Sequence, residues 1–130
     1  MREFMLAFMN TSNTAQDWSL DTGLEFPLAP HDNRHGQIVV NDDFVVRITV
    51  DTEQPTFAAA VLSYTYETDT WTLDGVPQNV WELGVHVVGG PQTLVTVKCS
   101  LDQNEARIER PTIKLNGPAP FDLDKLKASS

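Results

Sequence analysis

Short stretches of alternating apolar and polar residues recur along the chain, and Gly, Pro, Asn and Asp interrupt them at intervals typical of turns. In residues 44–50, the side chains of Val46, Ile48 and Val50 fall on one face, with polar residues between them. Because successive side chains of a strand point to opposite faces of its sheet, this pattern predicts a strand with one buried and one solvated face.

Further strands are expected where β-branched and aromatic residues gather between turn residues. They cover residues 17–20, 37–40, 57–66, 70–73, 80–88 and 94–99. The pair Asp74 and Gly75 is a typical short-loop signal and predicts a hairpin at that point. Residues 106–115 predict a last strand, which Pro111 assigns to a sheet edge or a bulge because proline donates no backbone hydrogen bond. Residues 122–127 are the helical candidate.

About eight short strands at this spacing predict an all-β protein, specifically a two-sheet antiparallel β-sandwich of the jelly-roll or immunoglobulin-like kind. A chain of 130 residues with 41% hydrophobic content can bury one core without disulfides. We expect a single sandwich domain over residues 1–116, followed by a Pro-containing tail at residues 117–130. The apolar, methionine-rich residues 1–9 are expected to form either the first strand or an arm that crosses onto a neighbouring subunit.

The chain carries nine Lys and Arg against eighteen Asp and Glu, a net charge of −9. This excess repels phosphate backbones and anionic lipid surfaces, so we expect neither nucleic acid nor a membrane as a partner. No stretch approaches the roughly 20 apolar residues that span a bilayer, and no clean signal-peptide cleavage site follows the apolar start. The expected location is the cytoplasm at synthesis, or a virion if the chain joins a particle.

The reactive side chains do not form a recognisable catalytic motif. Cys99 is the single cysteine, so it cannot form an internal disulfide, and its place in an alternating stretch predicts a small core side chain. The sequence contains no Gly-x-Ser-x-Gly nucleophile elbow and no phosphate-binding glycine loop. We therefore expect no enzymatic activity, no catalytic residue and no cofactor.

Two histidines have a spacing that occurs in metal sites. His31 and His35 lie four residues apart, with Asp32 between them and further carboxylates close by in the sequence. This spacing places ligands on one face of a helix, whereas residues 27–36 have the prolines and the glycine of a loop. A solvated loop is the favoured interpretation, and we expect no metal. His86 stands among valines and is expected to be a half-buried sheet residue.

The three tryptophans admit two interpretations. Trp18, Trp71 and Trp81 lie in separate predicted strands, so they either fill the sandwich core or line one sheet face as a platform for sugar rings. Large apolar side chains at alternating positions usually belong to the core, which is the interpretation that we favour.

Three functional hypotheses remain open. The leading one is a non-enzymatic structural or assembly protein that forms homo-oligomers or joins a larger assembly, most concretely a capsid decoration or cement protein of a phage or virus. The alternatives are a carbohydrate-binding module that uses surface tryptophans and an acidic inhibitor or immunity protein that binds a basic partner. The candidate interaction surface consists of Phe4, Met5, Leu6, Phe8, Trp71 and Trp81.

Overall fold

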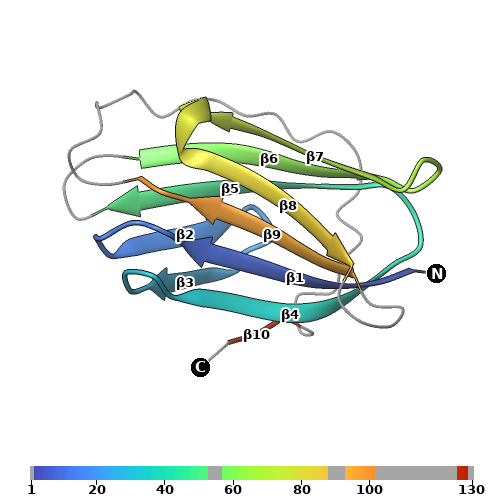
Figure 1. Cartoon of the computed structure of the whole chain (residues 1–130), viewed down its shortest axis with the longest axis horizontal. Coiled ribbons are helices and arrows are strands. Elements are labelled where there is room, and N and C mark those ends of the chain that lie inside the picture. The colour runs from blue at the N-terminus through green and yellow to red at the C-terminus, as the bar shows by residue number, and fades with distance from the viewer. Residues whose placement is uncertain (1, 53–56, 88–92, 102–125, 129–130) are drawn as a thin grey trace.

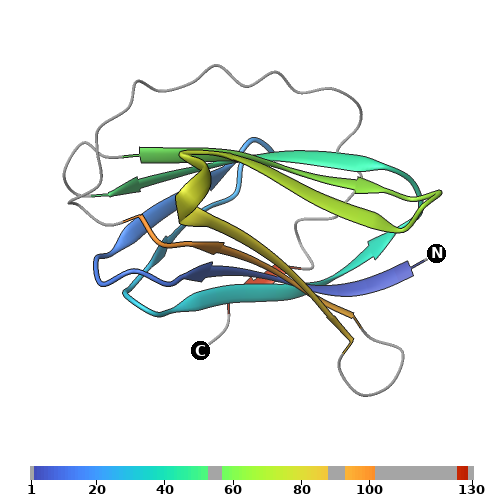
Figure 2. The ribbon, with the colours of Figure 1, turned by 45° about the horizontal axis from the view of Figure 1, so that its top comes forward.

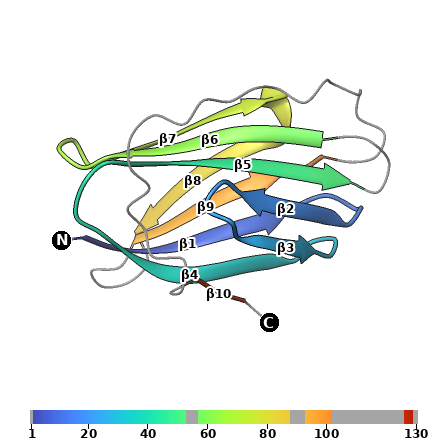
Figure 3. The ribbon, with the colours of Figure 1, turned by 180° about the vertical axis from the view of Figure 1, so that it is seen from behind.

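Two β-sheets pack face to face in the computed structural model, which describes residues 2–52, 57–87, 93–101 and 126–128 (Figures 1 and 3). Sheet A has the order β10 (Leu126–Ala128), β4 (Asn33–Val40), β1 (Arg2–Asn10), β9 (Thr93–Cys99) and β8 (Trp81–Val87). Sheet B has the order β3 (Glu25–Leu28), β2 (Gln16–Leu20), β5 (Phe44–Thr52), β6 (Phe57–Thr65) and β7 (Thr70–Val76). The prediction of an all-β, two-sheet sandwich is confirmed.

One strand pair departs from the antiparallel arrangement of the predicted sandwich. Strand β1 pairs with β4 in antiparallel orientation but with β9 in parallel orientation, with Leu6 opposite Val95. Parallel neighbours need a long connection, and here the chain passes through all of sheet B between β1 and β9. Local periodicity carries no information about such a distant partner. The described residues form ten strands, where about eight were expected.

The N-terminal segment is the central strand of sheet A and not an arm. Phe4, Leu6 and Phe8 alternate along β1 toward sheet B and are buried. The ring of Phe4 lies edge-on to Trp71 of β7, with 5.0 Å between the ring centroids, so β1 contributes directly to the contact between the sheets. This segment therefore fills the core of its own chain. Strand β5 follows the predicted alternation, with Val46, Ile48 and Val50 buried in the same core.

Two predicted turns differ from the structure. The Asp74 and Gly75 pair lies inside β7 and not in a turn. The chain does reverse between β6 and β7 at residues 67–69, whose Glu, Thr and Asp are typical of a turn, and Asp69 there has a φ of 52°. Gly75 is needed because the indole of Trp81 packs directly against its backbone. The polar loop predicted at residues 27–36 is shorter than expected, because β3 extends to Leu28 and β4 begins at Asn33.

Part of the predicted tail joins the fold. Leu126–Ala128 forms β10, which pairs antiparallel with β4, so the helical prediction is wrong at residues 126 and 127. The rest of that helical candidate, the strand predicted at residues 106–115 and the edge placement of Pro111 lie outside the described residues.

Candidate functional site

The outer face of sheet A, which points away from sheet B, carries three rows of side chains across β4, β1, β9 and β8. The register of the three strand pairs aligns them. The central row is His35, Ala7, Thr96 and Gly84, and the rows on either side are Asn33, Met9, Lys98 and Glu82, and Gln37, Met5, Leu94 and His86.

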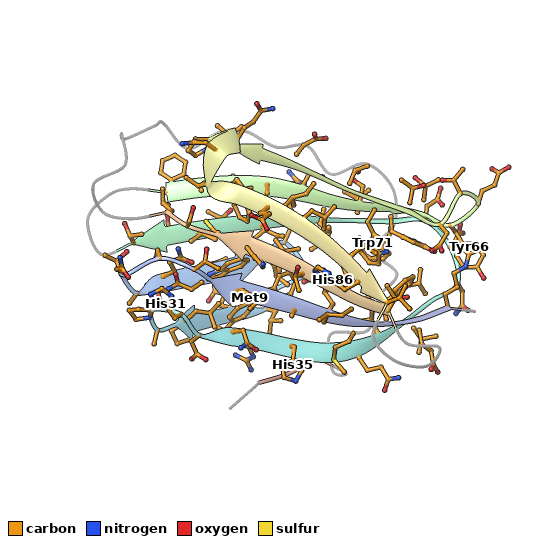
Figure 4. All side chains as sticks on the ribbon, viewed as in Figure 1. Met9, His31, His35, Tyr66, Trp71 and His86 are labelled. Carbon is orange, nitrogen blue, oxygen red and sulfur yellow. The ribbon has the colours of Figure 1, made fainter. Side chains whose placement is uncertain are left out.

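The middle of this face is hollow. Ala7, Thr96 and Gly84 are small, whereas both neighbouring rows carry long side chains. The result is an open cavity of about 420 Å³, which we call the outer hollow. Figure 4 labels three side chains of its lining, which are Met9 of β1, His35 of β4 and His86 of β8. The full lining is Met5, Ala7, Met9, Asn33, His35, His86, Leu94, Thr96 and Lys98.

Two polar atoms converge at the floor of the outer hollow. A Cβ atom placed on Gly84 would lie 2.5 Å from Nε2 of His86 and 2.6 Å from Oγ1 of Thr96, so both atoms border the space that the missing side chain leaves. The Thr96 side-chain oxygen is buried and has no hydrogen-bond partner within the described part of the chain. Since a buried hydroxyl without a partner is costly, this oxygen marks a place where a ligand atom would be favoured.

The rim of the outer hollow carries a histidine on one side and a lysine on the other. His35 lies at the β4 side, where its Nδ1 is 3.2 Å from the Asn33 side-chain oxygen. Lys98 lies at the opposite side, with its Nζ 3.6 Å from a carboxylate oxygen of Glu82. The Glu82 side chain is largely exposed, so this ion pair is weak and leaves Lys98 able to meet another anion.

The predicted histidine pair does not form a joint site. His31 lies in the turn before β4, and its Nε2 is 2.9 Å from the Asn13 side-chain oxygen, whereas His35 lines the outer hollow (Figure 4). The described residues contain no group of three or more His, Cys, Asp or Glu side chains arranged to hold a metal ion. Instead, His35 shares the outer hollow with His86, which the sequence presented as an isolated residue.

The tryptophans lie mainly in the core. Trp18 is fully buried and donates a hydrogen bond from Nε1 to Oε1 of Gln16 over 2.9 Å. Trp71 is 8% exposed, and Trp81 is partly buried against the core. A sugar platform needs at least one open indole face from each partner, so the platform of Trp71 and Trp81 is absent from the described surface. The core interpretation is confirmed for Trp18 and Trp71.

The other predicted interaction residues all lie on β1 and divide into a buried group and one residue on the outer face of sheet A. Phe4, Leu6 and Phe8 are buried in the core and are not available to a partner, because they alternate toward sheet B. Met5 points to the outer face and lines the outer hollow. The sequence alternation of residues 94–99 already places Thr96 and Lys98 on one face. The alternation does not predict which strands lie beside residues 94–99, and those neighbours complete the outer hollow.

A second exposed feature lies along β8. Val85 and Val87 share the core-facing side of this strand with Trp81 and Leu83, yet they are 51% and 83% exposed. Figure 2 shows the reason, since β8 runs diagonally away from β7, and no described strand of sheet B lies over its far end. Val85 and Val87 are the large apolar side chains exposed on β8, and we call these two residues the valine edge.

A polar cluster ties the two sheets together at the start of β1. The Tyr64 hydroxyl donates to Oδ1 of Asp69 over 2.6 Å and accepts from the Arg2 guanidinium over 2.8 Å. Arg2 also donates to the Tyr66 carbonyl and lies over the Tyr66 ring. Burial, followed by the hydrogen bond to Asp69, raises the pKa of Tyr64 above its usual value, and the hydrogen bond to Tyr64 raises the pKa of Arg2. These hydrogen bonds join the start of β1 in sheet A to the end of β6 in sheet B.

Replacing Tyr64 with phenylalanine is expected to lower the free energy of unfolding at pH 8 by about 1–2 kcal/mol, because Asp69 and Arg2 lose a hydrogen-bond partner. The raised pKa means that the Tyr64 contribution is present below the pKa of the unfolded chain, about 10, and is lost as pH rises through the folded pKa. Urea unfolding between pH 8 and pH 12 should therefore show a smaller alkaline decline for the variant. A Tyr66→Phe control leaves the Tyr64 hydroxyl in place and should show the same alkaline decline in the free energy of unfolding as the wild type. Equal declines for the wild type and Tyr64→Phe would contradict this assignment.

Fold and site together define a small all-β sandwich with a hollow on the outer face of one sheet and an uncovered apolar edge. Comparison with protein-family models, with curated protein sequences and with solved structures finds no match to this chain. Within the described ranges, no helix has the length and apolar character needed to cross a membrane.

Proposed function

We propose that this chain is a non-enzymatic structural or assembly protein that acts through contacts with further copies of itself or with a larger assembly. The observation that carries the proposal is the valine edge. The sequence had suggested an N-terminal arm as the contact with a partner, but β1 lies inside the fold, so the valine edge takes its place as the proposed contact surface.

Strand β8 has the properties of a docking edge. Among the described strands it is the last of sheet A, so β9 covers one side of its backbone and the other side is open. A strand from another chain that paired with β8 would gain main-chain hydrogen bonds and would cover Val85 and Val87 at the same time. Covering a valine side chain stabilises a complex by up to about 1.5–3 kcal/mol, which is enough for two residues to control association.

The specific version of this proposal is a decoration or cement protein of a phage or virus particle, and its location is then the virion. This version is supported by the combination of a compact β-sandwich with an apolar edge that no described strand covers. It can be tested by identifying the genes that flank the gene for this chain. Neighbouring capsid or tail genes would support a particle component, whereas a neighbouring toxin gene would favour the inhibitor alternative. That alternative depends on the net charge, and no contact between described residues favours it.

The association itself has a direct test. The wild-type chain is expected to self-associate with rising concentration in sedimentation velocity. Val87→Lys is expected to weaken association at least tenfold, or about 1.4 kcal/mol, because a charge replaces the most exposed large apolar side chain among the described residues. Val61→Lys is the matched control, since Val61 lies on β6, whose neighbours β5 and β7 cover both edges. A wild type that stays monomeric at every concentration, or equal effects of the two substitutions, would refute self-association through the valine edge.

A further inference from the structure

We propose that the outer hollow is a binding site for a small amphiphilic carboxylate, a molecule with an apolar body and one carboxylate group. This site is separate from the valine edge: it lies on the outer face of sheet A, whereas Val85 and Val87 are on the core-facing side of β8.

The walls of the outer hollow suit an apolar body. Met5 and Met9 of β1 and Leu94 of β9 rise on either side of the small central row. Methionine side chains are unbranched and adapt their shape to a ligand, which favours a flexible or flat apolar group over one rigid shape. The cavity volume of about 420 Å³ lies at the lower end of the range for small-molecule sites, about 300–1,000 Å³.

The floor of the outer hollow suits an oxygen-bearing group. The Thr96 residue is 5% exposed and its Oγ1 is without a partner among the described residues, so a ligand oxygen there would satisfy a hydroxyl that the fold leaves unsatisfied. Nε2 of His86 borders the same space at Gly84 and supplies a second polar contact. A few converging polar atoms beside apolar walls are the usual means of orienting a small ligand.

The charge distribution favours a carboxylate over an amine. Among the described residues that line the outer hollow, Lys98 carries the formal charge and none is a carboxylate, although the whole chain has a net charge of −9. Among the described residues, the acidic ones on this face are Glu82, which pairs with Lys98 at the rim, and Glu3, which lies one row beyond the lining. An anionic group in the outer hollow would therefore meet the Lys98 ammonium and the polar nitrogens of the two histidines, with no carboxylate among the described lining residues to repel it.

Decanoate is the probe for a first test, and decylammonium has the same alkyl chain with the opposite charge. Titration of the full ¹⁵N-labelled chain is expected to show saturable shifts for decanoate, centred on the amides of β1, β9 and the Gly84 region of β8. Decylammonium is expected to bind at least tenfold more weakly. Equal binding of the two probes, or shifts that never saturate, would overturn the proposal.

Two variants localise the site. Thr96→Val keeps the shape of the side chain and removes the hydroxyl, and Gly84→Ala fills the space between His86 and Thr96. Both are expected to weaken decanoate binding about tenfold. Thr49→Val on the outer face of sheet B is the matched control and should bind decanoate as the wild type does.

The two variants also separate binding from folding. Thr96→Val removes no hydrogen bond between described residues, so it is expected to fold even if Gly84→Ala does not. The amide spectrum of each free variant checks this before the titration. A folded Thr96→Val variant that retains wild-type affinity would overturn the proposal. A tenfold loss of affinity in Thr96→Val is sufficient to support it, whether or not Gly84→Ala folds.

Discussion

Replacing Asn10 with alanine is expected to lower the free energy of unfolding by about 3–5 kcal/mol, because several buried polar groups lose their partner at once. Asn10 ends β1 and is 1% exposed. Its Nδ2 donates to the carbonyls of Leu28 and Ala29, each over 3.1 Å, and to the Thr14 carbonyl over 2.8 Å. Its Oδ1 accepts from the backbone nitrogen and the hydroxyl of Ser12.

The position of Asn10 explains the size of this effect. The side chain links the end of β1 in sheet A to the end of β3 in sheet B and to the loop before β2. Alanine would leave these three carbonyls facing a small void, where water cannot fully replace the two N–H groups that they share. Equilibrium urea unfolding followed by circular dichroism measures the change. Asn13→Ala, at an exposed position in the same loop, should cost less than about 1 kcal/mol, and a comparable cost for the two substitutions would contradict this account.

Replacing Gly75 with alanine is expected to cost about 2–3 kcal/mol, through overpacking and not through backbone strain. A Cβ atom at Gly75 would overlap Cδ1 of Trp81 and would lie 2.5 Å from its Cγ and 2.8 Å from its Nε1. The indole has little room to retreat, because it packs edge-on to Trp18 with 5.8 Å between the centroids. The added methyl group therefore has to move either the β7 backbone or part of the core.

A double-mutant cycle with Trp81→Leu tests this cause. If the indole is the obstacle, Gly75→Ala should cost at least about 1 kcal/mol less in the Trp81→Leu background than in the wild type. Thr72→Ala, at an exposed position of the same strand, gives the baseline for a substitution in β7. An additive cycle would show that the cost arises from the backbone of β7 and not from its contact with Trp81.

The strands themselves were readable from the chain, because side-chain alternation is a local property. Val46, Ile48 and Val50 follow from a period of two residues, and so does the burial of Trp71. The same local information failed at Gly75. A glycine after aspartate resembles a turn, but the residue is present because a tryptophan six positions later needs its space.

The candidate site depended on information of a different kind. His35 lies far along the chain from His86 and Thr96. It shares the outer hollow with them because β1 pairs with β4 on one side and with β9 on the other, while β8 pairs with β9. Which strands become neighbours, and in what register, is decided by long-range packing between the two sheets. A shift of one residue in the register of β9 would turn Thr96 toward the core and remove the outer hollow. Local pattern thus determined the strands and their buried faces, whereas the pairing of distant strands determined the surface that they present.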